Sequence, residues 1–218
     1  STVFPYPTLF RSVRPGFPLA RSVSGLAGRI PATAIGMTLA HHGLVIWGDD
    51  TEACHARLVR ATKKIDEYLV ACRRGRLLMG TPARPIPAVE ERRRLAEIVL
   101  PAVRGALGKP ERVILNYDDR DDVLQVLAAE RTPELVRRAM ATPEHLLRAG
   151  RLPVWLDLDL GAPADRLGAQ VQAQLAAARV EYESYHGRNA AAWETPLDVW
   201  PKVVLARALG IITAFTDK

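Results

Sequence analysis

The stretch from residue 33 to residue 72 constrains the fold most, because two short apolar runs flank a histidine turn and a long amphipathic segment follows. Residues 33–39 and 43–47 are short, apolar and partly β-branched, which is typical of buried strands. His41 and His42 lie where the first run ends. A histidine there can bind a metal or carry a proton, although a polar pair with only a packing role is the simpler interpretation.

The amphipathic segment predicts a long helix with a defined start. Asp50 or Thr51 is expected to cap it, and the helix dipole favours Glu52 in its first turn. Six side chains three or four residues apart predict one buried stripe: Cys54, Leu58, Ala61, Ile65, Leu69 and Cys72. Both cysteines of the chain lie on this stripe, so we interpret them as small core residues. Their spacing suits reduced thiols better than a disulfide framework, and a cytoplasmic location is expected.

A proline-rich segment divides the chain. Residues 73–88 begin with arginines and then carry three prolines within six residues, which forbids a regular helix. We expect residues 13–72 and 89–218 to be α/β segments joined by this linker. The remaining hydrophobic pattern predicts helices at residues 18–29, 88–107, 123–130, 133–141, 143–149 and 163–192, and strands at residues 112–117, 153–158, 202–206 and 211–215. The inward face of the second of these helices is expected to carry Leu95, Ile98, Val99 and Val103.

The net charge of +6 suggests nucleic acid at first sight. However, the basic residues are interleaved with acidic ones, as where residues 92–94 (Arg-Arg-Arg) follow Glu90 and Glu91. Such runs are usually solvated helix faces, and the sequence contains no zinc finger, RNA-binding strand motif or basic arm. No apolar run approaches the roughly 18–20 residues that span a bilayer. We therefore expect neither a nucleic-acid partner nor a membrane partner.

The acidic run at residues 118–122 (Asp-Asp-Arg-Asp-Asp) raises the question of a metal site. It lacks the spaced aspartates, the central glycine and the terminal glutamate of a calcium loop. Carboxylates are also favoured at the amino terminus of a helix, where the dipole is positive. The start of a helix is therefore the simpler interpretation of this run.

The first twelve residues differ from the rest of the chain. They carry two prolines and scattered aromatic residues without helical or strand periodicity, and they lack the order of features that defines a signal peptide. Residues 2–12 are similar to the conceptual translation of a common sequencing-adapter oligonucleotide. We interpret residues 1–12 as a non-native leader, with a natural extended arm as the alternative, and we expect the native sequence to extend upstream.

Several motifs resemble one protein family. The most specific is His-Gly-Leu-Val-Ile-Trp-Gly-Asp at residues 42–49. Supporting segments lie at residues 13–20, 65–69, 142–148, 182–185 and 203–210. Together they resemble the class II aldolase/adducin family. The similarity is greatest to the aldolase-like part of bifunctional rhamnulose-1-phosphate aldolase/alcohol dehydrogenase proteins, in which a short-chain dehydrogenase domain follows. Residues 13–72 would then be the C-terminal portion of the aldolase-like domain, and residues 89–218 would lead to the dehydrogenase.

This resemblance implies a three-layer α/β/α fold with a mixed, largely antiparallel sheet, assembled as a homo-oligomer. It also implies a zinc ion held by three histidines, two from a His-x-His pair and one from an Asn-His-Gly turn, with an upstream glutamate as acid/base. The third histidine corresponds to His42, whereas His41 replaces the usual asparagine, which leaves its role open. The chain contains no His-x-His pair, and His55, His145 and His186 are isolated, so none of these is assigned to zinc.

The implied chemistry shows why the missing ligands matter. Aldol cleavage of a ketose phosphate leaves an enediolate, whose charge a zinc ion stabilises while a carboxylate moves the proton. Catalytic zinc needs about three protein ligands and an open position. We therefore expect this chain to bind zinc poorly and to cleave nothing on its own, and we assign no catalytic residue. The glycine-rich fingerprint of a dinucleotide site does not occur in the sequence either.

Three functions are compatible with these observations. The favoured one is part of a zinc-dependent sugar-phosphate aldolase fused to a dehydrogenase, with a sugar phosphate as substrate. The second is a dehydratase or epimerase acting on sugar phosphates on the same scaffold, because a fold does not fix a reaction. The third is a non-enzymatic, adducin-like interaction module. An upstream segment without the His-x-His pair would favour this third function.

Overall fold

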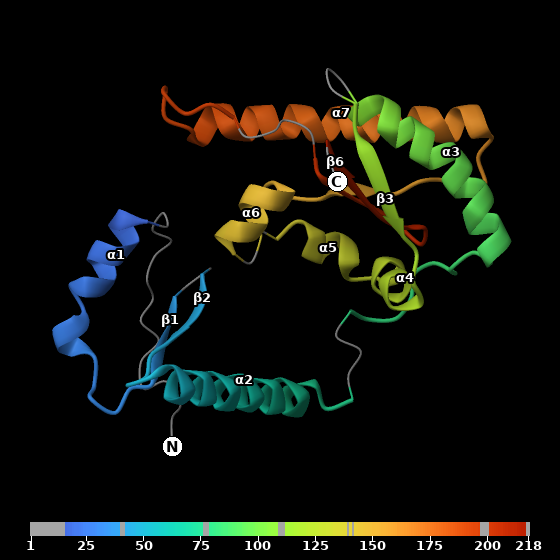
Figure 1. The fold of residues 1–218 in the computed structure, drawn as a ribbon. Coiled ribbons are helices and arrows are strands. Elements are labelled where there is room, and N and C mark those ends of the chain that lie inside the picture. The colour runs from blue at the N-terminus through green and yellow to red at the C-terminus, as the bar shows by residue number, and fades with distance from the viewer. Residues whose placement is uncertain are drawn as a thin grey trace. The chain divides into compact units, whose positions relative to one another are not determined.

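The computed structural model describes residues 16–39, 42–75, 79–108, 112–138, 140, 142–196 and 201–216 (Figure 1). The chain divides into two compact units, which are described separately. The first unit comprises residues 1–78 with 141–143, and the second comprises residues 79–140 with 144–218. The boundary after residue 78 falls inside the proline-rich segment 73–88, whereas the proposed leader at residues 1–12 lies outside the described residues.

The first unit contains a short helix, a hairpin and a long helix. The elements are α1 (Phe17–Ser24), a 3-10 turn (Ala27–Arg29), β1 (Gly36–Leu39), β2 (Gly43–Ile46) and α2 (Thr51–Arg73). The predicted order of strand, histidine turn, strand and capped helix is confirmed. The helix predicted over residues 18–29 ends earlier, because Gly25 closes α1 and the chain continues as a single 3-10 turn.

The hairpin is antiparallel, and it is less buried than the sequence predicts. Leu39 pairs with Gly43 next to the turn, and Gly36 pairs with Ile46 at the far end. Of the described strand residues, Leu39 is buried, whereas β2 alternates between exposed and half-buried side chains. The prediction of two buried strands is therefore wrong for β2, and in β1 it holds only for Leu39, because Thr38 is exposed and the other two residues are half-buried. The alternation in β2 is that of a strand with one face toward water.

Helix α2 begins as predicted, since the Asp50 carboxylate accepts a hydrogen bond of 2.7 Å from the backbone N–H of Ala53. The predicted burial of its stripe is wrong. Within the described residues Ala61 is buried and Cys54 is half-buried, whereas the rest of the stripe is exposed: Leu58, Ile65, Leu69 and Cys72. A helix of 23 residues is about 34 Å long. Strands of four residues span about 13 Å, so the hairpin is long enough to cover only part of α2.

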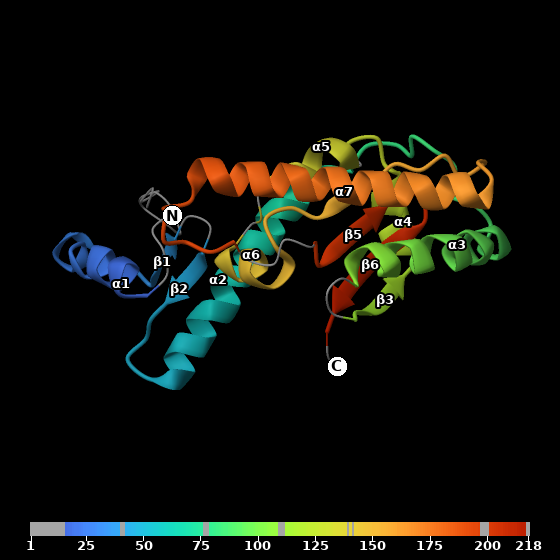
Figure 2. The same ribbon diagram turned by 90° about the horizontal axis from the view of Figure 1, so that it is seen from above.

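The second unit is a four-stranded sheet with helices on both faces. Its elements are α3 (Val89–Leu107), β3 (Ile114–Asp118), α4 (Asp121–Ala128), α5 (Thr132–Val136), α6 (Pro143–Ala149), β4 (Val154–Leu156), α7 (Ala164–Asn189), β5 (Val203–Ala206) and β6 (Gly210–Phe215). The strand order is β3-β6-β5-β4. The first two pairs are antiparallel, and β5 and β4 are parallel. Helices α3 and α7 lie on one face, and α4 lies against β6 on the other (Figures 1 and 2). This confirms the predicted α/β class with a mixed, largely antiparallel sheet.

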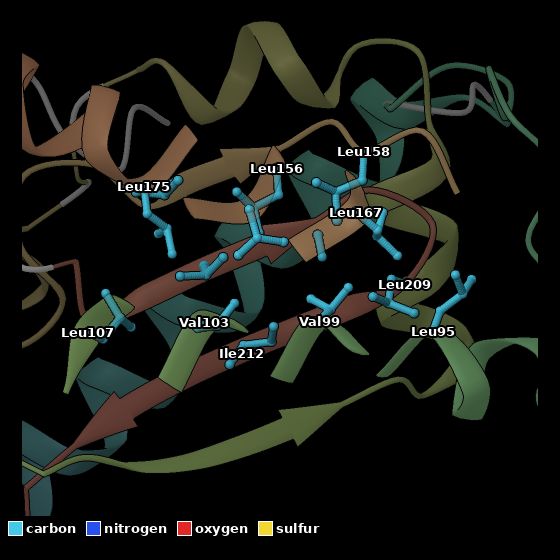
Figure 3. Close-up of a cluster of buried hydrophobic side chains, with 14 residues drawn as sticks. Leu95, Val99, Val103, Leu107, Leu156, Leu158, Leu167, Leu175, Leu209 and Ile212 are labelled. Carbon is cyan, nitrogen blue, oxygen red and sulfur yellow. The ribbon is translucent and has the colours of Figure 1, made fainter. Parts of the chain in front are cut away.

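The core of this unit lies between the sheet and the paired helices α3 and α7 (Figure 3). Helix α3 contributes the predicted inward residues Leu95, Val99 and Val103, and the predicted Ile98 packs against them half-buried. The other side chains at the centre come from α7 and the sheet: Leu167, Val171, Leu175, Leu156, Val204 and Ile212. Because strand side chains alternate between faces, every second residue of β4 and β5 reaches this core.

Arg92 corrects the expectation that the arginine run is a solvated face. Its side chain is buried, whereas Arg93 and Arg94 are exposed. Position 92 lies three and seven residues before Leu95 and Val99, so it shares their inward face. The guanidinium is satisfied there, because Nε donates to Asp119 Oδ2 at 3.2 Å and Nη1 donates to the carbonyl of Pro87 at 2.8 Å.

Residues from the predicted linker contribute to the second unit. The backbone N–H of Ala83 donates to the carbonyl of Ala128, and that of Glu130 donates to the carbonyl of Thr81. Residues 81–83 therefore run beside the end of α4 as a short bridge. Among the described residues, no helix is both long enough and apolar enough to cross a membrane.

Candidate functional site

The described part of the histidine turn places His42 directly before β2. Its backbone N–H donates to the carbonyl of Leu39 at 3.0 Å, which closes the turn, and its side chain is half-buried. Gly43 follows with φ of 116°, a backbone conformation that favours glycine. The turn geometry therefore fixes the backbone position of the predicted zinc ligand, while His41 lies outside the described residues.

The Trp-Gly-Asp part of the motif has a structural role that the sequence did not reveal. Trp47 Nε1 donates to the carbonyl of Ala34, and Arg57 of α2 donates to the carbonyl of Trp47 at 2.9 Å. A Cβ at Gly48 would lie 2.5 Å from the backbone nitrogen of Cys54, so a larger residue would push α2 away. This segment therefore fixes the helix against the hairpin that carries His42.

The described residues do not by themselves form a metal site. Within the described ranges, no three histidine, cysteine, aspartate or glutamate side chains lie close enough to hold a metal ion. His42 can supply one imidazole, whereas a catalytic zinc ion needs about three protein ligands. A zinc site that uses His42 would therefore need ligands from outside the described residues.

The acidic run at residues 118–122 is engaged in local ion pairs and a helix start. Asp118 accepts hydrogen bonds from the guanidinium of Arg120, and this lowers the pKa of the Asp118 carboxyl. Asp119 pairs with Arg92, and the two remaining aspartates occupy the first turn of α4. These contacts account for the run as the helix start that the sequence predicted.

Tyr117 is held inside the second unit. Its hydroxyl donates to the carbonyl of Leu209 at 2.8 Å. Burial, with a smaller contribution from the nearby carboxylate of Asp119, raises the pKa of Tyr117 to about 12. The neutral hydroxyl is therefore the form that this site stabilises.

A second group of charged side chains lies where the parallel strands β4 and β5 end. Asp157 follows β4 and Arg207 follows β5, and Arg84 joins them from the proline-rich segment. The Asp157 carboxylate lies 2.8 Å from Arg84 Nη1 and 3.0 Å from Arg207 Nη1. The sequence did not predict this group. Arg84 donates to the carbonyl of Leu158, which is 74 residues away, and no motif links such distant positions.

Comparison with known proteins identifies the family. Residues 94–218, more than half of the chain, match the family described as "Aldolase class II, second domain". The chain therefore belongs to this class II aldolase family, as the motifs predicted. Apart from residues 141–143, the matched range lies within the second unit, and it does not include His42.

One similar relative is much longer than this chain. The "Uncharacterized oxidoreductase YuxG" of Bacillus subtilis (strain 168) is 28% identical over 207 residues. The alignment covers 92% of this chain and 29% of the relative, so the chain spans less than a third of that protein. No solved structure shows significant similarity to the chain.

Proposed function

We propose that this chain is part of a zinc-dependent sugar-phosphate aldolase of the rhamnulose-1-phosphate type, fused to a short-chain dehydrogenase. The observation that carries the proposal is the match of residues 94–218 to the second domain of class II aldolases. The longer relative is named as an oxidoreductase, which supports a dehydrogenase elsewhere in the complete protein. The substrate would be a sugar phosphate, and the complete protein would be a homo-oligomer in the cytoplasm.

His42 would supply one zinc ligand in the complete protein. In this reaction class the metal stabilises the negative charge that develops on the substrate oxygen. The hairpin contributes orientation, because the hydrogen bond from His42 to Leu39 and the following Gly43 fix the turn. The remaining ligands and the acid/base carboxylate would come from outside the described residues. We therefore expect the 218-residue chain alone to bind zinc poorly and to be inactive.

The exposed stripe on α2 favours one alternative, an adducin-like interaction module. Leu69 is 58% exposed, and Leu58 and Ile65 of the same stripe are exposed as well, so that apolar side chains three or four residues apart face solvent along α2. Such a surface suits protein contacts as well as it suits the core of a larger domain. Zinc content and activity separate the two functions, because a purely interacting module needs neither.

The test compares the chain with the polypeptide that its full reading frame encodes. Zinc per chain is measured by mass spectrometry, and rhamnulose 1-phosphate is assayed for cleavage, dehydration and epimerisation in parallel. We expect about one zinc ion and cleavage activity in the longer polypeptide, and at least a tenfold loss of both in His42→Ala. His55→Ala is the matched control, because His55 is exposed on α2. Unchanged zinc and cleavage in His42→Ala would refute the assignment, and dehydration or epimerisation without cleavage would change the reaction class.

A further inference from the structure

The charged group at the ends of β4 and β5 sets two guanidinium groups against one carboxylate. Arg84 and Arg207 both contact one carboxylate, that of Asp157. Guanidinium groups stay protonated at all physiological pH values, so these three side chains carry a net charge of about +1. Asp159, two residues further on, adds a second negative charge to this end of the sheet, and its Oδ1 accepts a hydrogen bond from the backbone N–H of Gly161 at 3.2 Å.

The arginines retain donors that their contacts do not use. Arg207 Nε is fully buried and has no hydrogen-bond acceptor among the described residues, and the side chain as a whole is 13% exposed. A ligand could therefore reach only the terminal nitrogens of Arg207, not Nε. Each guanidinium has five N–H donors in a planar fork, and Asp157 engages one nitrogen of each. Arg84 adds a contact from Nη1 to the carbonyl of Leu158 at 3.1 Å. A further acceptor with several oxygens would satisfy donors that the protein leaves unused.

The surrounding backbone holds the group in place. Gln174 of α7 both accepts from the N–H of Asp157 and donates to its carbonyl, at 3.0 and 3.1 Å. Gln170 accepts from the N–H of Asp159 at 3.0 Å, and the N–H of Arg207 donates to Leu156 at 3.0 Å. The group is also open to solvent on one side, because Arg84 is 44% exposed and Asp157 is 40% exposed. The two guanidinium groups are therefore held in fixed positions at the carboxyl ends of β4 and β5, with one side of the pair open to solvent.

We propose that Arg84 and Arg207 bind the phosphate group of a small phosphorylated molecule. Phosphate has the oxygen spacing that a guanidinium fork contacts with two hydrogen bonds, and its charge exceeds that of the single carboxylate already present. Asp157 orients the two forks by occupying one nitrogen of each. The site lies entirely within the second unit, so it depends neither on His42 nor on zinc.

The test titrates inorganic phosphate into the 218-residue chain at constant ionic strength and measures binding by calorimetry. We expect saturable binding by the unmodified chain and at least fivefold weaker binding by Arg84→Gln. Arg94→Gln is the matched control, because Arg94 is exposed and pairs with one carboxylate, that of Glu91. It should bind phosphate as the unmodified chain does.

Arg207→Lys provides a second variant that keeps the charge and removes the fork, and it should also bind at least fivefold more weakly. If its burial prevents folding, Arg84→Gln decides, since that side chain is largely at the surface. The proposal is overturned by absence of saturable phosphate binding in the unmodified chain. It is equally overturned if Arg84→Gln changes the affinity less than fivefold, or if Arg94→Gln weakens binding as much.

Discussion

Gly210, the first residue of β6, offers the sharpest test of the sheet order. A Cβ at this position would lie 2.6 Å from Cε2 of Tyr117 and 2.7 Å from the backbone oxygen of Asp118. Contacts under 3.0 Å require something to shift, and here the neighbours are a ring and backbone. The residue also has φ of 157°, which L side chains rarely adopt.

Gly210→Ala should therefore destabilise the second unit by about 2–4 kcal/mol. Forcing extra carbon into a packed site costs about 1–3 kcal/mol, and strain at an unfavourable φ adds to that cost. The loss would arise from separation of β3 and β6, which are paired through Asp118 and Ile211 directly beside this glycine.

The assay is urea unfolding, with hydrogen exchange of peptides from β3 and β6 to report on this unit specifically. Gly161→Ala is the control, because its nearest neighbour, Asp159 Oδ1, would be at an ordinary 3.6 Å. It should change the free energy of unfolding by less than about 1 kcal/mol. Equal effects of the two substitutions, or a Gly210→Ala effect below about 1 kcal/mol, would show that β6 does not lie against β3 as described.

Three further perturbations test the core and its charges. Leu175→Ala should lower the free energy of unfolding by about 2–5 kcal/mol, because the Leu175 side chain is fully buried. Val180 is exposed on the same helix, so Val180→Ala should cost under about 0.5 kcal/mol. Similar costs for both variants in urea unfolding would contradict the packing of α7. Asp119→Asn removes the negative charge that faces buried Arg92. It should lower the free energy of unfolding by about 1–2 kcal/mol, less than for a fully buried pair because Asp119 is partly exposed. An unchanged urea midpoint would argue against this ion pair. The pKa of Tyr117 is raised to about 12, so the stability that its neutral hydroxyl confers is complete below pH 10 and is lost as the pH rises from 10 to 12. Two pKa units correspond to about 2.7 kcal/mol, which solvent screening of the half-buried side chain reduces to about 1 kcal/mol. Tyr117→Phe should remove this part of the pH dependence of urea unfolding, and an identical profile in both proteins would refute it.

The sequence predicted which elements exist better than how they are buried. In the second unit, periodic apolar residues located most helices and strands to within a few residues, and the inward residues of α3 were correct. The helix predicted over residues 133–141 is an exception, because α5 ends at Val136. Burial there follows local periodicity because each element has a partner to cover its apolar face. In the first unit the same reasoning failed for α2, whose stripe extends beyond the short hairpin.

Long-range relations were not accessible from the sequence. The burial of Arg92 depends on Asp119, which is 27 residues away. The contact between Arg207 and Asp157 joins residues 50 positions apart, and only the parallel pairing of β4 and β5 brings them together. For the candidate zinc ligand, the motif located His42, and the structure added the turn and the packing of Gly48 that position it.

Anomalous diffraction at the zinc edge, from crystals of the complete polypeptide, tests the central claim most directly. The proposed function predicts one strong peak about 2.0–2.1 Å from an imidazole nitrogen of His42, with other protein ligands completing the site. A zinc peak elsewhere with His42 unligated, or a zinc-free protein that still cleaves the sugar phosphate, would contradict it.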